Sequence, residues 1–168
     1  MVNCISILGS TGSIGRQSLD VVRMHPEIRV AALTAGSSLE LLSQQCREFR
    51  PELAVVATEE GAKALKEMLR DIPVRVSFGM EGLLEAATLE SADCVITAVV
   101  GMLGLRPTLA AIHARKRIGL ANKETLVCAG ELVMAEARKY GAKIIPVDSE
   151  HSAIFQCLMG CEDRKEVK

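Results

Sequence analysis

Short apolar runs alternate along the chain with stretches in which apolar residues recur at helical spacing. The runs are rich in Val, Ile and Leu and are apolar almost throughout, which is typical of strands covered on both faces of a parallel sheet. We predict strands at 4–8, 29–34, 53–57, 74–78, 93–98, 117–121 and 143–147. We predict helices between them at 15–24, 39–49, 59–70, 80–89, 107–114 and 125–140.

The 39–49 segment illustrates the helical pattern. One of its faces carries, at positions i, i+3, i+6 and i+7, Leu39, Leu42, Gln45 and Cys46. Pro107 suits a first helical turn, and Gly141 follows a predicted helix where a C-terminal glycine is common. Strand and helix therefore repeat along the chain, joined by loops of a few residues.

Repeats of strand and helix predict an α/β fold, with a doubly wound, mostly parallel sheet of about seven strands and right-handed crossovers. The pattern continues without a break to Val147, so we predict one domain over residues 1–147. Residues 148–168 are too few to form a domain of their own.

Composition narrows the class of protein. The 168 residues are 49% apolar and 24% charged, with a formal net charge of -1, which indicates a globular protein rather than a disordered one. There is no long basic run, and one Tyr, three Phe and no Trp offer few surfaces for base stacking, so we expect no nucleic-acid partner. The longest apolar run, 94–105, is shorter than the roughly 20 residues that span a bilayer. We interpret it as a buried strand and turn, and we expect no membrane association.

The N-terminal residues lack the basic segment and cleavage site of a signal peptide, so we expect a cytoplasmic protein. Six cysteines without a C-x-x-C pair are interpreted as reduced core residues rather than as disulfides or metal ligands: Cys4, Cys46, Cys94, Cys128, Cys157 and Cys161. His25 and His113 fall at a predicted helix end and inside a predicted helix, and neither suits a catalytic role.

Three glycines, Gly9, Gly12 and Gly15, lie at G-x-x-G-x-x-G spacing between the first predicted strand and the first predicted helix. Such glycines permit a tight turn, let the backbone approach a pyrophosphate and let helix and strand pack closely, while the helix N-terminus attracts the anion. This position favours a Rossmann-like dinucleotide site over a merely structural turn.

NAD and NADP are usually distinguished after the second strand, where this chain has Gly36, Ser37 and Ser38. No Asp or Glu is present to bind a ribose 2′-hydroxyl or to repel a 2′-phosphate, and both serines are potential hydrogen-bond donors. The lack of a carboxylate and the two serine hydroxyls at residues 36–38 therefore favour NADP over NAD. The structural alternative is that the serines cap the following helix.

Two polar clusters follow later strands, at the edge where ligands of open α/β sheets bind. Asn122, Lys123 and Glu124 follow the sixth predicted strand, and a solvated helix start is their structural alternative. Asp148 and Glu150 follow the seventh and form an oxygen-rich pair suited to Mg²⁺ or Mn²⁺. A helix N-cap at Asp148, with Glu150 in the first turn, explains both acids equally well without a metal.

Together these motifs resemble those of the 1-deoxy-D-xylulose 5-phosphate reductoisomerase family. The similar segments, in the family's order, are 9–15 (Gly-Ser-Thr-Gly-Ser-Ile-Gly), 120–124 (Leu-Ala-Asn-Lys-Glu) and 146–156 (Pro-Val-Asp-Ser-Glu-His-Ser-Ala-Ile-Phe-Gln). The resemblance implies an NADPH-dependent oxidoreductase and isomerase of non-mevalonate isoprenoid biosynthesis, which converts 1-deoxy-D-xylulose 5-phosphate to 2-C-methyl-D-erythritol 4-phosphate. It also implies a divalent cation, Mn²⁺ or Mg²⁺, that holds the phosphorylated sugar, and a homodimer of the complete enzyme.

Carried over residue by residue, the resemblance implies cofactor contacts by Thr11, Gly12, Ser13, Ile14, Gly36, Asn122 and Glu124. We add Ser37 and Ser38 to the cofactor site as hydrogen-bond donors. The resemblance implies substrate contacts by Lys123, Ser149 and Glu150, and metal ligation by Asp148 and Glu150.

The chain departs from the family in two respects. Many members carry Gly-Lys-Asn at 36–38, where this chain has Gly-Ser-Ser. The resemblance therefore implies no lysine contact with a 2′-phosphate in this chain. In the family, a third acidic metal ligand and the substrate-phosphate groups follow the last motif. We therefore expect residues 148–168 to begin a catalytic domain that is incomplete here, and the chain to be a cofactor-binding fragment that is inactive alone. Two alternatives stay open: an NADP-dependent semialdehyde or acyl-phosphate reductase with Cys128 as nucleophile, and a non-catalytic dinucleotide-binding module.

Overall fold

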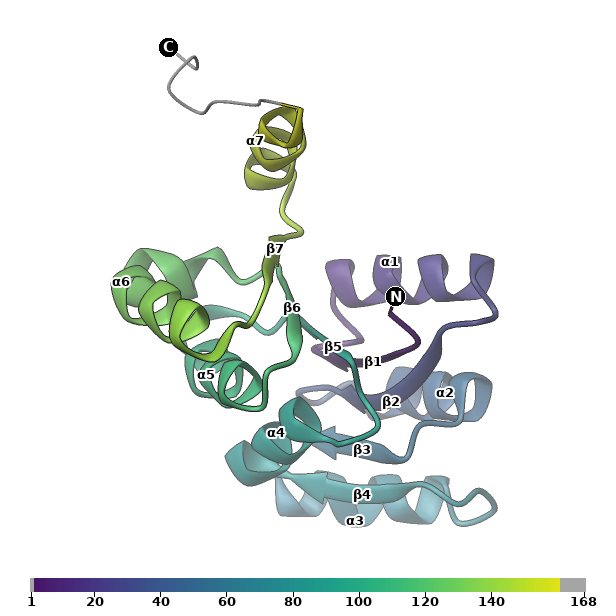
Figure 1. Ribbon diagram of the computed structural model, residues 1–168. Helices are drawn as coiled ribbons and strands as arrows, with labels where there is room; N and C mark the ends of the chain where they lie inside the picture. The colour runs from purple at the N-terminus through teal and green to yellow at the C-terminus, as the bar shows by residue number, and fades with distance from the viewer. Residues whose placement is uncertain (1, 161–168) are drawn as a thin grey trace.

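The computed structural model describes residues 2–160, which contain a seven-stranded sheet with α-helices on both faces (Figure 1). The strands are β1 (Cys4–Leu8), β2 (Arg29–Thr34), β3 (Leu53–Val56), β4 (Arg75–Phe78), β5 (Cys94–Thr97), β6 (Arg117–Leu120) and β7 (Ile144–Pro146). Their spatial order is β4-β3-β2-β1-β5-β6-β7, and every neighbouring pair is parallel. The predicted parallel α/β fold is confirmed.

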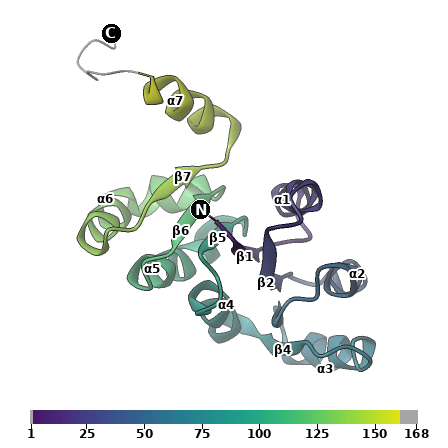
Figure 2. The same ribbon diagram turned by 45° about the vertical axis from the view of Figure 1, so that its right-hand side comes forward.

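The helices form two layers (Figure 2). One layer holds α1 (Ser13–Met24), α2 (Leu39–Phe49) and α3 (Glu59–Met68). The other holds α4 (Gly79–Thr88), α5 (Leu105–His113) and α6 (Lys123–Tyr140), with a short 3₁₀ helix η1 (Gly101–Gly104) before α5. Successive residues of a strand face opposite layers, so Ile7 of β1 belongs to one core cluster and Leu8 to the other. This explains why the strands are apolar almost throughout.

The strand order reverses at β1. Strands β2 to β4 extend the sheet on one side of β1, and β5 to β7 extend it on the other. Crevices at the carboxyl ends of the strands beside such a switch point are the usual ligand sites of doubly wound sheets. The glycine loop after β1 and the loop after β5 meet at this point, because an added Cβ at Gly9 would lie 2.7 Å from the carbonyl oxygen of Ala98.

The sequence predictions hold to within a few residues at the ends of most elements, with three corrections. Val100 to Leu103 are not a buried turn: Val100 is 85% exposed, because η1 lies at the surface. The predicted helix 125–140 starts at Lys123 and has a kink at Ala129. Cys128 and Cys157 are exposed, whereas the other cysteines in the described residues are buried; Cys161 lies outside the described residues.

The last element, α7 (Ser149–Met159), has no buried residue and contacts β7 at its base. Figures 1 and 2 show it standing away from the two layers. Its exposed apolar residues include Ile154 and Met159. Within residues 2–160, no helix is long and apolar enough to cross a membrane. The predicted boundary at residue 147 stays a prediction.

Candidate functional site

The three glycines of the β1–α1 loop have different structural roles. Gly9 has φ of +88° and packs against the end of β5, so a side chain there is strained. An added Cβ at Gly15 would lie 2.3 Å from the carbonyl oxygen of Gly9, so helix and loop pack too closely for any side chain. At Gly12 the same Cβ would meet only that oxygen, at 3.4 Å. The fold therefore requires Gly9 and Gly15, whereas the missing side chain of exposed Gly12 leaves space for a ligand.

The start of α1 supplies hydrogen-bond donors at this space. Gly12 is the N-cap, and no side chain caps the helix. The first backbone N–H groups of a helix have no partner inside it, so those of Ser13 and Ile14 are available to an anion. Thr11 precedes them and is half-buried. The predicted pyrophosphate contacts thus lie together, on the end of the glycine loop and the first residues of α1.

Sequence reasoning placed Gln45 on the inward face of α2 but missed its connection to this loop. The Gln45 side chain is 4% exposed, and its Nε2 donates to the carbonyl oxygen of Ser10 at 3.0 Å. The Ser10 hydroxyl donates to Gln45 Oε1 at 2.7 Å and to the Thr34 carbonyl at 3.2 Å. The backbone N–H of Gly9 donates to Thr34 Oγ1 at 2.8 Å. A buried amide on an otherwise apolar helix face was the available signal, because such a group needs polar partners.

A small, mostly apolar crevice of about 140 Å³ lies beside the glycine loop. Gly9, Thr34 and Gly36 line it, together with side chains from β3, α4 and the loop after β5. The next two residues, Ser37 and Ser38, are exposed. Ser38 occupies the N-cap position of α2, as the structural alternative predicted, but its hydroxyl caps no N–H group. Neither serine hydroxyl has a hydrogen-bond partner in residues 2–160, so both remain available to a ligand.

Asn122 is 3% exposed, and both the amide nitrogen and the amide oxygen of its side chain form hydrogen bonds within the chain. Its Nδ2 donates to the carbonyl oxygens of Val99 and Gly101 at 2.5 and 2.8 Å. Its Oδ1 accepts from the backbone N–H and the hydroxyl of Thr125, both at 3.0 Å, which caps α6. The side chain therefore fixes the loop after β5 to the start of α6. A cofactor contact by Asn122 stays a prediction, as does one by exposed Glu124 in the same turn.

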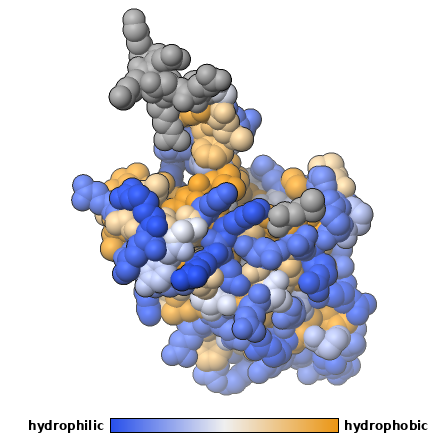
Figure 3. All heavy atoms as spheres, in the orientation of Figure 1, coloured by the Kyte–Doolittle hydropathy of each residue, from blue (hydrophilic) through white to orange (hydrophobic). Residues whose placement is uncertain are grey.

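A second hollow, of about 420 Å³, brings the two later motifs together. Lys123 at the start of α6 lines it, and so do Asp148 and His151 at the start of α7. The remaining lining is apolar and includes Leu126, Val127, Met134, Ile144 and Pro146. Figure 3 shows apolar surface at the base of α7, above the sheet. Lys123 and Asp148, which are 25 positions apart in sequence, thus line one hollow at the edge of the sheet where both motifs were expected.

Asp148 lines this hollow and Glu150 does not, and the two acids take the capping arrangement at the start of α7. Asp148 Oδ2 accepts from the backbone N–H of His151 at 3.1 Å and lies 2.5 Å from its Nδ1. Partial burial raises the pKa of Asp148, but these contacts outweigh it and hold that pKa below the usual value. The pKa of Glu150 is lowered by its own backbone N–H, by the Ser149 hydroxyl and by the Lys123 ammonium. Both acids are therefore ionised at neutral pH and lie within electrostatic range of each other.

The donor set of this site is chemically suited to a hard cation, because Asp148 and Glu150 offer carboxylate oxygens. No group of three or more His, Cys, Asp or Glu that could hold a metal ion occurs in residues 2–160. The acid pair thus fits a divalent cation as a partial ligand set, and its metal role stays a prediction.

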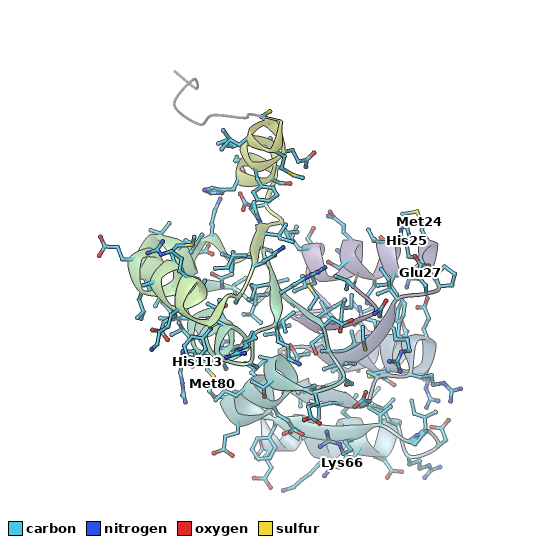
Figure 4. The ribbon with its side chains drawn as sticks, in the orientation of Figure 1. Met24, His25, Glu27, Lys66, Met80 and His113 are labelled. Atoms are coloured by element: carbon cyan, nitrogen blue, oxygen red, sulfur yellow. The ribbon has the colours of Figure 1, made fainter. Side chains whose placement is uncertain are left out.

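Other candidate groups lie apart from these hollows. Figure 4 shows His25 at the far end of α1, where its Nδ1 contacts Glu27 Oε1 at 3.1 Å. His113 ends α5, with its Nε2 2.6 Å from Glu136 Oε2. The Cys128 thiol is exposed on α6 and has no hydrogen-bond partner in the described residues, so no base among them activates it as a nucleophile.

Comparison with known proteins agrees with this geometry. A family model described as 1-deoxy-D-xylulose 5-phosphate reductoisomerase matches residues 5–130. The protein of that name from Agathobacter rectalis is 56% identical over 156 residues, which are 93% of this chain and 41% of that protein. A crystal structure of DOX-P reductoisomerase in complex with magnesium is 44% identical, with a TM-score of 0.90 over 94% of this chain and 40% of that one.

The 1-deoxy-D-xylulose 5-phosphate reductoisomerase from Zymomonas mobilis in complex with NADPH is 40% identical, with a TM-score of 0.89 over 94% of this chain and 41% of that one. The chain thus spans about two fifths of the length of these relatives. Because the family model matches most of its residues, the chain belongs to the 1-deoxy-D-xylulose 5-phosphate reductoisomerase family.

Proposed function

We propose that this chain binds NADPH and is the cofactor-binding part of an enzyme that converts 1-deoxy-D-xylulose 5-phosphate to 2-C-methyl-D-erythritol 4-phosphate. The relative from Zymomonas mobilis was solved with NADPH, and a second relative with magnesium. The bound dinucleotide supplies hydride to the carbonyl carbon that is reduced. We also propose that the complete enzyme is a homodimer and that it is cytoplasmic.

The observation that carries the proposal is the open position at Gly12. The fold tolerates a side chain there, since an added Cβ would meet only the Gly9 oxygen at an ordinary 3.4 Å. Its absence instead clears the approach to the unpaired N–H groups at the start of α1, which is what a pyrophosphate needs. The side chains of Gln45 and Thr34 form hydrogen bonds to the backbone of this loop, so its shape is fixed before a ligand binds.

We propose a substrate and metal site formed by the hollow between α6 and α7 and by the adjacent first turn of α7. Asp148 and Glu150 would hold Mn²⁺ or Mg²⁺, which supplies Lewis-acid polarisation when bound. Lys123 and Ser149, which flank these acids, would contact the oxygen-rich substrate. Two carboxylates bind such a cation weakly, so we expect the chain to bind NADPH without turning the substrate over.

Titration of the chain with NADPH tests the cofactor role. We expect NADPH to bind at least tenfold more tightly than inorganic phosphate or ATP, by calorimetry and by nicotinamide fluorescence. Gly12→Ala should lower the NADPH affinity about tenfold without changing the melting temperature, because the new methyl group occupies ligand space. Gly130→Ala is the matched control, since its Cβ would meet only Leu126 at 4.0 Å. Binding of NADPH no tighter than that of phosphate would refute the proposal.

The metal role is tested with Mn²⁺ by electron paramagnetic resonance. Asp148→Asn should abolish the weak binding of Mn²⁺ and leave the NADPH affinity within twofold. Asp71→Asn is the control, because Asp71 is an exposed acid that pairs with Arg47 and follows α3, which lies at the opposite end of the fold from α7 (Figure 1). Equal Mn²⁺ binding by the parent chain and Asp148→Asn would reject Asp148 as a ligand.

A further inference from the structure

A groove of about 470 Å³ separates α1 from α2. Ser13, the first residue of α1, and Leu41, in the first turn of α2, line one end of it. Helices that follow parallel strands begin at the carboxyl edge of the sheet. This end of the groove therefore borders the glycine loop and residues 36–38, the two loops of the proposed cofactor site.

Two arginines of α1, Arg16 and Arg23, line the groove. Arg23 pairs with Asp20 at 2.5 Å and with the two carboxylate oxygens of Glu48 at 2.6 and 2.7 Å. These are the two carboxylates of the groove. Arg16 is exposed, and its guanidinium forms no hydrogen bond or ion pair within residues 2–160. It is the uncompensated positive charge of the groove, about two helical turns nearer to the cofactor loops than Arg23.

The described part of the chain gives the Arg16 guanidinium no stabilising partner. The N-terminal end of a helix carries partial positive charge, which disfavours a cation in its first turns. The hydroxyls of Ser37 and Ser38, on the neighbouring loop, also lack partners in the described residues. A guanidinium and two hydroxyl donors at adjacent loop and helix ends form a donor set suited to a phosphate group.

We infer that Arg16 recognises the ribose 2′-phosphate of NADPH and sets the preference of this chain for NADPH over NADH. The inference rests on the proposed function, because it takes the glycine loop as the pyrophosphate site. Residues 35–38 contain neither a cation to attract this phosphate nor a carboxylate to repel it. Arg16 supplies the missing charge from α1, and Ser37 and Ser38 supply hydrogen bonds from the other side.

The test compares NADPH and NADH binding to the 168-residue chain and three variants. Arg16→Met should weaken NADPH binding about tenfold, the effect of one lost charge-assisted contact, and change NADH binding less than twofold. Arg16→Lys should restore much of the preference, because it keeps the charge. Arg23→Met, which removes the paired arginine of the same groove, should leave the ratio of the two affinities unchanged. Binding of 2′-AMP should follow NADPH across the series, and binding of 5′-AMP should follow NADH.

Each other outcome overturns the inference. An unchanged NADPH-to-NADH ratio in Arg16→Met, with tight NADPH binding by the parent chain, removes the role of Arg16 and leaves the proposed function intact. An equal loss of both affinities indicates a general effect on the loop rather than recognition of the 2′-phosphate. The same loss in Arg23→Met indicates a diffuse charge effect. A parent chain that binds neither dinucleotide refutes the proposed function together with the inference.

Discussion

Replacement of Gln45 by Met tests whether the amide behind the glycine loop stabilises the fold. Met keeps the length of the side chain and a high helix propensity but cannot bond to Ser10. The substitution leaves the Ser10 carbonyl without the donor that lies 3.0 Å away and removes the 2.7 Å acceptor of the Ser10 hydroxyl. The hydroxyl keeps its 3.2 Å contact with the Thr34 carbonyl, so the main loss is one unpaired buried carbonyl.

An unpaired buried carbonyl costs about 1–3 kcal/mol, so we expect the free energy of unfolding to fall by about 2 kcal/mol. For a chain of this length that corresponds to a melting temperature lower by about 4–8 °C. Urea unfolding followed by circular dichroism measures the loss, and the slope with urea concentration should not change. Gln44→Met is the matched control: Gln44 is exposed on the same helix, so we expect a change within about 0.5 kcal/mol.

The contact is isolated by adding Ser10→Ala. The second substitution should cost about 1 kcal/mol less in the Gln45→Met background than in the parent chain, because the shared hydrogen bond is already lost. A Gln45→Met variant as stable as Gln44→Met would refute the reasoning, since it would mean that water or another donor satisfies the Ser10 carbonyl.

Three further predictions follow from the structure. Gly15→Ala should destabilise the chain by about 2 kcal/mol or more, because the new Cβ would lie 2.3 Å from the carbonyl oxygen of Gly9. Gly36→Ala is the control and should leave the stability unchanged in the same urea assay, because its Cβ would have no neighbour within 4 Å. Equal effects of the two substitutions would contradict the packing argument. Two backbone N–H groups at the start of β1 donate to Asp93 and lower its pKa, so its contribution to stability is present above the unfolded pKa of about 4 and is lost as the pH falls through the folded value. Asp93→Asn should therefore differ from the parent more at pH 6 than at pH 3 in urea midpoint, and an equal difference at both values would count against it. Ellman's reagent should modify exposed Cys128 and Cys157 in the folded chain, and the buried thiols only after unfolding. Among the buried thiols, burial raises the pKa of Cys46 to about 12, so that thiol should react slowly while the chain is folded. Rapid labelling of Cys46 in the folded chain would disprove its burial.

Much of the fold was predictable because it depends on local patterns. Apolar runs such as 4–8 and 29–34 indicated strands buried on both faces, and both strands have those bounds in the structure. The glycine spacing indicated a loop between strand and helix, and the structure gives each glycine the geometry that its position requires. Lys123 and Asp148 were expected at one edge of the sheet because both follow parallel strands, and they line one hollow.

What the sequence by itself determined is therefore the order and type of the elements and the edge at which the polar motifs gather. The tertiary structure decided which side chains meet there. Gln45 reaches Ser10 because α2 packs on β2, the strand beside β1 and its glycine loop, and Asn122 turns inward to hold the loop after β5. Within residues 2–160 the Arg16 guanidinium is unpaired, because Arg23 takes both carboxylates of their groove. Periodicity fixes the face of a helix on which a residue lies, but the neighbour of that face is set by the packing of distant segments, and no local pattern encodes it.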